Sequence, residues 1–79
     1  MFFIYVINSL SRKYIYFGMT NNLDRRIKEH NMGQNRSTKA YKPFELILKE
    51  EFPTKDEARQ REKYLKSGIG KEFLKKLLK

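Results

Sequence analysis

The apolar run from Phe2 to Ile7 restricts the fold of this chain more than any other segment. Its side chains are apolar at odd and even positions alike, so a strand formed by it should be buried on both faces and lie inside a sheet. The run has no basic flank and is too short for a signal peptide or a membrane span, so we expect neither. The sequence therefore predicts a central, buried strand over residues 2–7.

Length and composition narrow the class of protein. The 79 residues predict one domain over positions 1–79, and a chain of this size buries roughly 60% of the surface that its unfolded form exposes. Cysteine is absent and histidine occurs once, which excludes disulfides, thiolate zinc sites and histidine-rich metal sites. These features exclude the disulfide-stabilised secreted mini-proteins and lead us to expect a cytoplasmic location.

Two further segments predict β-strands. A short polar turn separates residues 2–7 from residues 14–19, so these two strands should form an antiparallel hairpin. In one register of that hairpin Tyr5 lies directly opposite Tyr16, although the turn length does not fix the register. Two strand tyrosines are usually packing residues. Residues 44–52 alternate in the manner of a third strand.

Three helices are expected around these strands. Asn22 is a suitable N-cap for a helix that runs to about Asn31. The sequence Thr54-Lys55-Asp56-Glu57 is a capping box, and the helix it starts should carry Ile69 on its inward stripe. Residues 70–79 can form a last short helix. The predicted fold class is α+β, a small three-stranded antiparallel sheet flanked by three helices in the order β-β-α-β-α-α.

The charge balance favours a polyanionic partner. Lysine and arginine number 18 against nine acidic residues, a net charge of +9, which attracts phosphates. Segment 31–43 carries Arg36, Lys39 and Lys42 with no acid to balance them. From Arg59 onward there are eight basic residues and two acidic ones. A merely soluble, lysine-rich surface would have a similar composition, so charge alone leaves that alternative open.

Three ionisable side chains fall on helix faces that should point toward the sheet. Arg26 and His30 are four residues apart on one stripe, and Glu62 lies on the inward stripe of the later helix. A buried, unpaired charge is costly, so each residue needs a partner or a task. Structural alternatives exist for each: Arg26 can reach water, His30 can face the helix dipole, and Glu62 can pair with Lys66 or Arg59. The three together favour a functional site.

At these positions the sequence resembles the GIY-YIG nuclease family. The two signature triplets correspond to Phe3-Ile4-Tyr5 and Tyr16-Phe17-Gly18, and the spacing from Tyr16 to Arg26 and His30 is that of the family. Glu62 falls in the helix where the family keeps its metal-binding acid. The likeness is strongest to small stand-alone bacterial members and extends to the N-terminal nuclease module of the excision-repair incision protein.

The sequence also departs from the family pattern in two places. Phe3 replaces the first glycine of the family name, as in other stand-alone members. Many active members carry an asparagine late in the domain, but in this chain no asparagine follows Asn35.

The resemblance implies an Mg²⁺-dependent endonuclease that hydrolyses phosphodiester bonds in DNA or RNA, with DNA favoured, in repair or processing of structured nucleic acid. Glu62 would hold the single divalent ion and Arg26 would grip the scissile phosphate. Tyr5 would accept the proton of the attacking water, while Tyr16 and His30 orient water and phosphate. Because tyrosine has a pKa of about 10, Arg26 and the metal would have to lower the pKa of Tyr5.

Four residues are candidate contacts to nucleic acid outside the catalytic set: Gly18, Arg36, Lys39 and Lys42. Gly18, at a strand end, indicates either a β-bulge or a close approach of a phosphate. Two other functions remain open, a non-catalytic nucleic-acid-binding module of the same fold and a protein–protein adaptor with a basic face. The catalytic set favours the nuclease, because binding alone does not require it. The oligomeric state is left undefined by the sequence.

Overall fold

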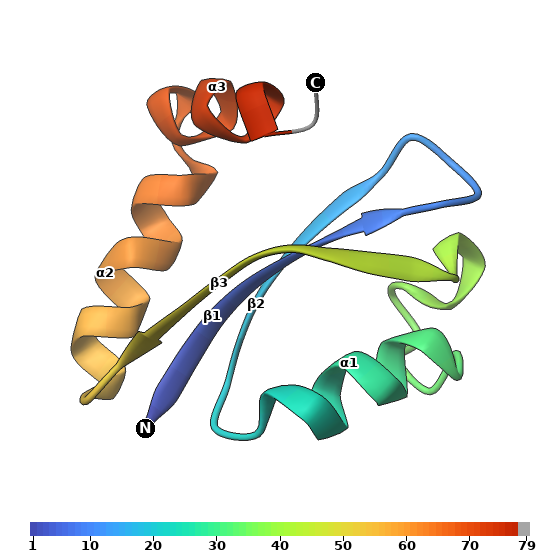
Figure 1. The fold of residues 1–79 in the computed structure, drawn as a ribbon, viewed down its shortest axis with the longest axis horizontal. Helices are drawn as coiled ribbons and strands as arrows, with labels where there is room; N and C mark the ends of the chain where they lie inside the picture. The colour runs from blue at the N-terminus through green and yellow to red at the C-terminus, as the bar shows by residue number, and fades with distance from the viewer. Residues whose placement is uncertain (78–79) are drawn as a thin grey trace.

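Strand β1 (Phe2–Ser9) lies between β2 (Ile15–Thr20) and β3 (Phe44–Phe52) in an antiparallel sheet of order β2-β1-β3 (Figure 1). The computed structural model describes residues 1–77. Ile4 to Ile7 are each at most 1% exposed, so the apolar run does form the central strand. The prediction made from its two apolar faces is confirmed.

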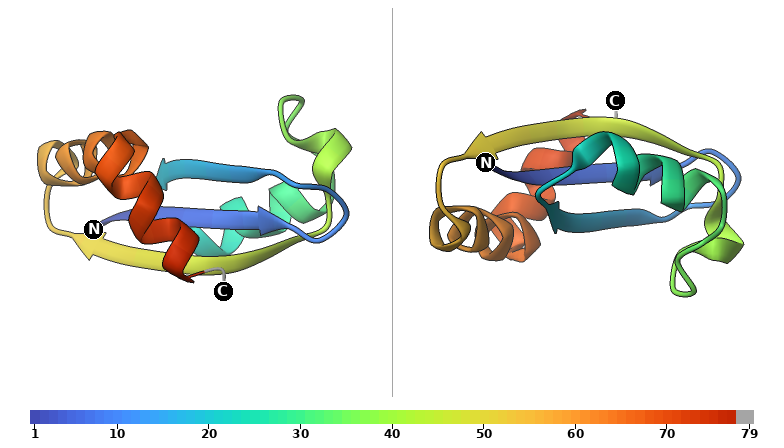
Figure 2. Two further views of the ribbon diagram at one scale, coloured as in Figure 1. Left: turned by 90° about the horizontal axis from the view of Figure 1, so that it is seen from above. Right: turned by 90° about the horizontal axis from the view of Figure 1, so that it is seen from below.

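Helices cover both faces of this sheet. Helix α1 (Leu23–Asn31) lies against one face, while α2 (Lys55–Lys66) and α3 (Gly68–Leu77) lie against the other, as Figure 2 shows. The predicted α+β fold and its β-β-α-β-α-α order are confirmed, with one short 3₁₀ helix, η1 (Lys39–Tyr41), added before β3. Among residues 1–77, no helix combines the length and the apolar character that crossing a membrane requires.

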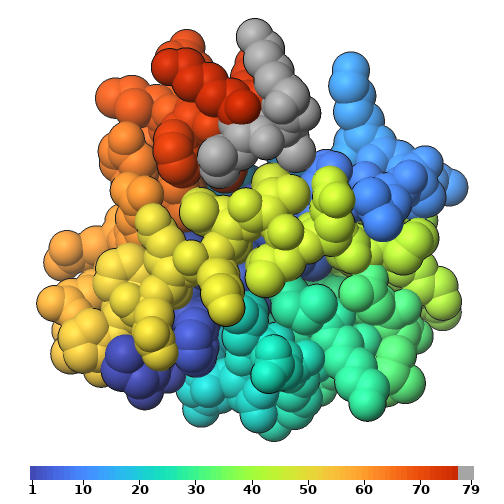
Figure 3. Space-filling view, in the orientation of Figure 1, coloured from blue at the N-terminus to red at the C-terminus, as the bar shows by residue number. Residues whose placement is uncertain are grey.

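The alternation of β1 divides the interior into two apolar cores. Ile4 and Val6 pack with residues of α2 and α3, namely Ala58, Leu65 and Leu74. Tyr5 and Ile7 point the other way and pack with Leu23 and Phe44 on the α1 side. In the space-filling view of Figure 3, β3 runs between α1 and the pair α2 and α3. Side chains of α1 and α2 therefore start from opposite faces of the sheet.

Side-chain caps fix where the first two helices begin. The Asn22 side-chain oxygen accepts a hydrogen bond from the Arg25 N–H, with an N–O distance of 3.2 Å. The Thr54 hydroxyl accepts from the Glu57 N–H at 3.3 Å. Both predicted N-caps are confirmed, and each satisfies an N–H that the helix itself leaves unpaired.

The prediction for Ile69 was wrong. Its side chain is 69% exposed, because α2 ends at Lys66 and the chain turns at Ser67 before Ile69 enters the first turn of α3. The turn depends on Gly70, where a Cβ atom would overlap the Tyr64 carbonyl oxygen and the backbone of Leu65. The last helix thus starts two residues before the predicted position, at Gly68. Residues 78–79, assigned to it from the sequence, lie outside the described residues.

Candidate active site

The β1–β2 hairpin brings two tyrosines together in a different register from the one considered above. Tyr5 lies opposite Gly18 and Ile7 opposite Tyr16, so Tyr5 and Tyr16 are diagonal neighbours, not direct partners. The shift is two residues, which leaves both side chains on the same face of the sheet. Their ring centroids are 6.3 Å apart. The tyrosines are therefore neighbours on the α1 side.

Gly18 allows this arrangement. A Cβ atom at Gly18 would overlap the phenol ring and hydroxyl of Tyr5, so any larger residue would displace the tyrosine. The register runs without interruption from Phe3 opposite Thr20 to Asn8 opposite Ile15, so the bulge considered at Gly18 is not formed. Close packing of Tyr5 is one reason for a glycine at this position, and the phosphate contact at Gly18 stays a prediction.

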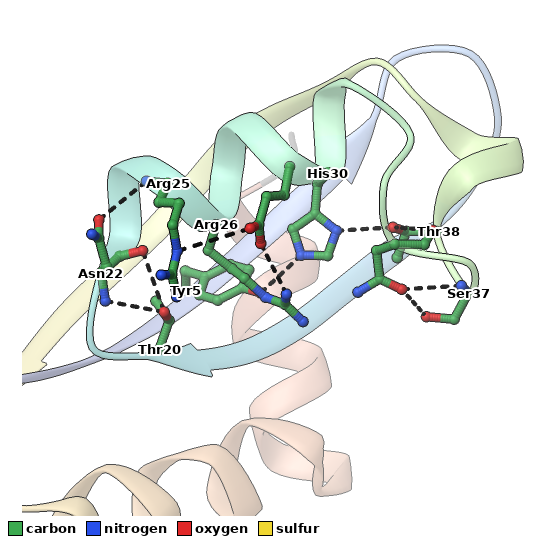
Figure 4. A network of polar contacts seen from close by, with 10 residues as sticks. Tyr5, Thr20, Asn22, Arg25, Arg26, His30, Ser37 and Thr38 are labelled. Carbon is green, nitrogen blue, oxygen red and sulfur yellow. Dashed lines mark hydrogen bonds and ion pairs between the residues drawn. The ribbon is translucent and has the colours of Figure 1, made fainter.

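His30 connects α1 to the tyrosines. It is fully buried, with Nε2 2.9 Å from the Tyr5 hydroxyl oxygen and Nδ1 2.8 Å from the Thr38 hydroxyl oxygen (Figure 4). Its ring centroid is 4.9 Å from that of Tyr16 and 5.9 Å from that of Phe44. The prediction that His30 points toward the sheet is confirmed.

Arg26, one turn before His30, lies at the edge of the site. Its side chain is 35% exposed and forms an ion pair with Glu29, with an N–O distance of 3.1 Å. Burial has the largest effect on the pKa of the nearby Tyr5 hydroxyl, and Arg26 acts in the opposite direction. Arg26 thus has one side in the protein and one side open, which suits a group that binds an anion.

A basic hollow adjoins Arg26. Its volume is about 310 Å³, and its cationic lining residues are Arg25, Arg26 and Lys55, so it lies between the starts of α1 and α2. A larger hollow, of about 510 Å³, lies between β2 and α3 around Phe17 and Leu74. None of the predicted catalytic residues lines the larger one. The smaller hollow is therefore the one connected to the candidate site.

Burial controls the proton affinities of the central pair. It raises the pKa of Tyr5 to about 12, although the Arg26 guanidinium acts in the opposite direction. Burial, and then the positive charge of Arg26, lower the pKa of His30 below its usual value. At neutral pH Tyr5 therefore keeps its proton and His30 is uncharged. The expected effect of Arg26 on Tyr5 is present, but it is weaker than the effect of burial.

Glu62 belongs to α2, a different element from those that carry this group. Its side chain is 23% exposed and pairs with Lys66 at 3.5 Å, which is one of the structural alternatives considered for it. Within residues 1–77, no hydrogen bond or ion pair joins Glu62 to Tyr5, Arg26 or His30. The fold brings the tyrosines, Arg26 and His30 together, and the assignment of Glu62 to the same site stays a prediction.

The chemistry of Glu62 still fits a weakly held Mg²⁺ ion. In the described part of the chain, no three histidine or acidic side chains cluster to form a metal cage. Mg²⁺ keeps several waters in most protein sites and needs only one or two carboxylates in addition to substrate phosphates. Glu62, partly exposed and paired only at 3.5 Å, offers one such carboxylate.

Segment 31–43 packs against the site through Thr38. Arg36, Lys39 and Lys42 are exposed. Thr38, in contrast, is fully buried against His30, and Tyr41 stacks on Tyr14 with a centroid distance of 3.9 Å. Thr38 was not predicted as a site residue, because a threonine in a segment without apolar periodicity carries no signal of burial.

Comparison with known proteins identifies the family. The model of the GIY-YIG catalytic domain matches residues 1–75. The chain belongs to the GIY-YIG family. Membership supports a nuclease role or another role that involves nucleic acid, and it confirms the resemblance seen at the two signature triplets.

Similar GIY-YIG proteins include several of the UPF0213 group. The chain is 45% identical to the UPF0213 protein YazA of Bacillus subtilis over 81% of its own length and 65% of the length of YazA. Identity to a UPF0213 protein of Natronomonas pharaonis is 38%, over 82% of this chain and 76% of that protein. The solution NMR structure of a UPF0213 protein from Bacillus halodurans is 34% identical, has a TM-score of 0.57, and matches 98% of this chain and 85% of that one.

Proposed function

We propose that this GIY-YIG protein is an Mg²⁺-dependent endonuclease that hydrolyses phosphodiester bonds, with DNA favoured over RNA as substrate. The observation that carries the proposal is the convergence of Tyr5, Tyr16 and His30 beside Arg26, which borders a basic hollow. Binding alone needs cations and stacking surfaces but no buried tyrosine–histidine pair. Family membership supports the broader role in nucleic-acid chemistry.

Each member of the group has a task that its position suits. Arg26 binds the scissile phosphate with the donors on its open side. The attacking water gives a proton to the Tyr5 hydroxyl oxygen, and Tyr5 passes its own proton to Nε2 of His30, 2.9 Å away. The water oxygen bonds to phosphorus, and the leaving oxygen departs and takes a proton from solvent. His30 thus receives the proton that Tyr5, with its high pKa, cannot release to water.

Two further groups complete the proposal. Tyr16, beside His30 in the same cluster, orients the water and the phosphate. Glu62 would hold Mg²⁺, and the ion, when bound, would supply positive charge at the phosphoryl oxygens. The basic hollow between Arg25 and Lys55 gives a neighbouring phosphate of the strand a place to bind.

The direct test is cleavage of labelled oligonucleotides. Single-stranded, nicked, flapped and duplex DNA, and matching RNA, are incubated with pure protein in Mg²⁺ or in EDTA. We expect Mg²⁺-dependent cutting of at least one DNA substrate, and a loss of about 100-fold or more in Arg26→Ala. Arg59→Ala, which removes an exposed arginine of α2, is the matched control. Tight binding without cutting would support the non-catalytic binding module. The absence of both binding and cutting would support the protein–protein adaptor.

We also expect the binding affinity to fall steeply with salt. Each neutralised phosphate contributes a slope of about −0.9 on duplex and about −0.7 on single strands in a plot of log K against log salt. Replacing Arg36, Lys39 and Lys42 with alanine should flatten that slope and weaken binding to all sequences alike. The measurement is a fluorescence-anisotropy titration at four or more salt concentrations.

The control removes the same charge elsewhere, with alanine at Lys63, Lys75 and Lys76, exposed residues of α2 and α3. A similar loss of slope in both triple variants would show that only net charge matters. A slope near zero in the unmodified protein would contradict polyanion binding altogether.

A further inference from the structure

His30 is the single imidazole of the chain, and both of its ring nitrogens have a partner in the interior. The Tyr5 hydroxyl lies 2.9 Å from Nε2, and the Thr38 hydroxyl lies 2.8 Å from Nδ1 (Figure 4). All three residues are at most 1% exposed. A neutral imidazole has one N–H and one lone pair, so it donates a hydrogen bond to one neighbour and accepts a hydrogen bond from the other.

The surroundings decide which nitrogen carries the hydrogen. On one side, the Tyr5 hydroxyl lies 2.9 Å from Nε2 of His30. If Tyr5 donates its O–H there, Nε2 holds the lone pair and the hydrogen is on Nδ1.

The hydrogen bonds of Thr38 decide the same question from the Nδ1 side. The Thr38 hydroxyl has a backbone carbonyl within reach, that of Asn35, at 3.5 Å. A carbonyl only accepts, so Thr38 donates there and uses its oxygen to accept the Nδ1–H of His30. From Tyr5 to the Asn35 carbonyl, every contact then has one donor and one acceptor. With the hydrogen on Nε2, Nδ1 would need the one hydroxyl hydrogen that Thr38 gives to the Asn35 carbonyl.

We propose that Thr38 is a positioning residue that fixes the Nδ1–H tautomer of His30 and so keeps Nε2 available for the proton of Tyr5. Thr38 acts through His30 and has no contact with substrate. The effect of Thr38 on catalysis rests on the proposed nuclease function, whereas its effect on the tautomer of His30 does not. A histidine held in the opposite tautomer has no lone pair facing Tyr5 and cannot accept that proton.

The local fold holds Thr38 in place for this task. Its N–H donates to the Asn35 carbonyl at 3.2 Å, and its own carbonyl accepts from the Tyr41 N–H at 2.9 Å. The Asn35 side chain in turn accepts from the Ser37 N–H at 3.0 Å. The backbone on both sides of Thr38 is thus fixed by hydrogen bonds, so the hydroxyl meets the imidazole without a loss of loop entropy at the time of reaction.

The test compares Thr38→Val, which keeps the branched shape but loses the hydroxyl, with Thr38→Ser, which keeps the hydroxyl. ¹⁵N NMR of the imidazole reads the tautomer directly, because His30 is the chain's only histidine. We expect Nδ1–H in the unmodified protein and in Thr38→Ser, and a population shift toward Nε2–H in Thr38→Val. In cleavage assays, kcat should fall on the order of tenfold or more in Thr38→Val, with KM little changed and activity retained in Thr38→Ser.

The outcomes separate this proposal from the nuclease function. An Nε2–H tautomer in the unmodified protein would overturn it without any variant, even if Thr38→Val fails to fold. An unchanged tautomer in folded Thr38→Val, or full kcat despite a changed tautomer, would overturn it as well. The expected tautomers in a protein that cuts no substrate would leave the role of Thr38 toward His30 in place and reject the nuclease function.

Discussion

Replacing Glu62 with glutamine is expected to abolish cleavage while nucleic-acid binding is retained or becomes tighter. The neutral amide cannot replace a hard anionic oxygen as an Mg²⁺ ligand, and removing a negative charge favours phosphate binding. Folding should change little, because the pair with Lys66 is partly exposed at 3.5 Å and contributes at most about 1 kcal/mol. Cleavage rate, affinity and melting temperature are measured on the same preparation.

A matched control is Glu51→Gln, which removes an exposed carboxylate of β3. This variant should cut normally. Cleavage by Glu62→Gln at the full rate would reject the assignment of Glu62 as the metal ligand. A fall in cleavage that only follows a fall in melting temperature would instead assign Glu62 a structural role as an ion-pair partner. Because Glu62 belongs to α2, whose first residue Lys55 lines the basic hollow beside Arg26, this variant also tests whether α2 contributes a metal ligand to the site.

Replacing Tyr5 with phenylalanine should lower the cleavage rate at least about tenfold, since it removes the hydroxyl that takes the proton from water. The ring remains, so packing against Gly18 and Tyr16 is preserved. The loss leaves Nε2 of the buried His30 without its partner, which costs about 1–3 kcal/mol of folding free energy. The rate must therefore be measured well below the melting temperature of the variant.

Tyr14→Phe is the control for this change, because Tyr14 stacks on Tyr41 and has no part in the proposed chemistry. It should keep its activity. Near-normal cutting by Tyr5→Phe would remove Tyr5 as the group that accepts the proton of water. It would leave the binding of the phosphate by Arg26 as a separate question, answered by Arg26→Ala.

Much of the architecture follows from local sequence patterns. The apolar run of residues 2–7 indicated the central strand, and the side chains of Asn22 and Thr54 indicated where two helices begin. These features depend on interactions within a few residues, which is why they can be read without knowledge of the fold. The inward positions of Arg26 and His30 follow in the same way from a helical repeat of four residues.

Contacts between segments that fold against one another could not be predicted from such local patterns. The hairpin register depends on the fit of the Tyr5 ring over Gly18, and the end of α2 depends on the contact of Gly70 with Tyr64. Thr38 becomes a partner of His30 only when segment 31–43 folds back over α1. The proton affinities of Tyr5 and His30 likewise depend on burial, which the order of residues does not give.

The sequence by itself determined the element order, the family motif and the identity of the ionisable residues on inward faces. Only the tertiary structure decided which of those residues meet. It joined Tyr5, His30 and Thr38 by hydrogen bonds and set Glu62 on an element that packs against the other face of the sheet. The physical reason is that periodicity fixes the face of a helix or strand on which a side chain lies, whereas distances between elements are fixed by close packing of the two cores.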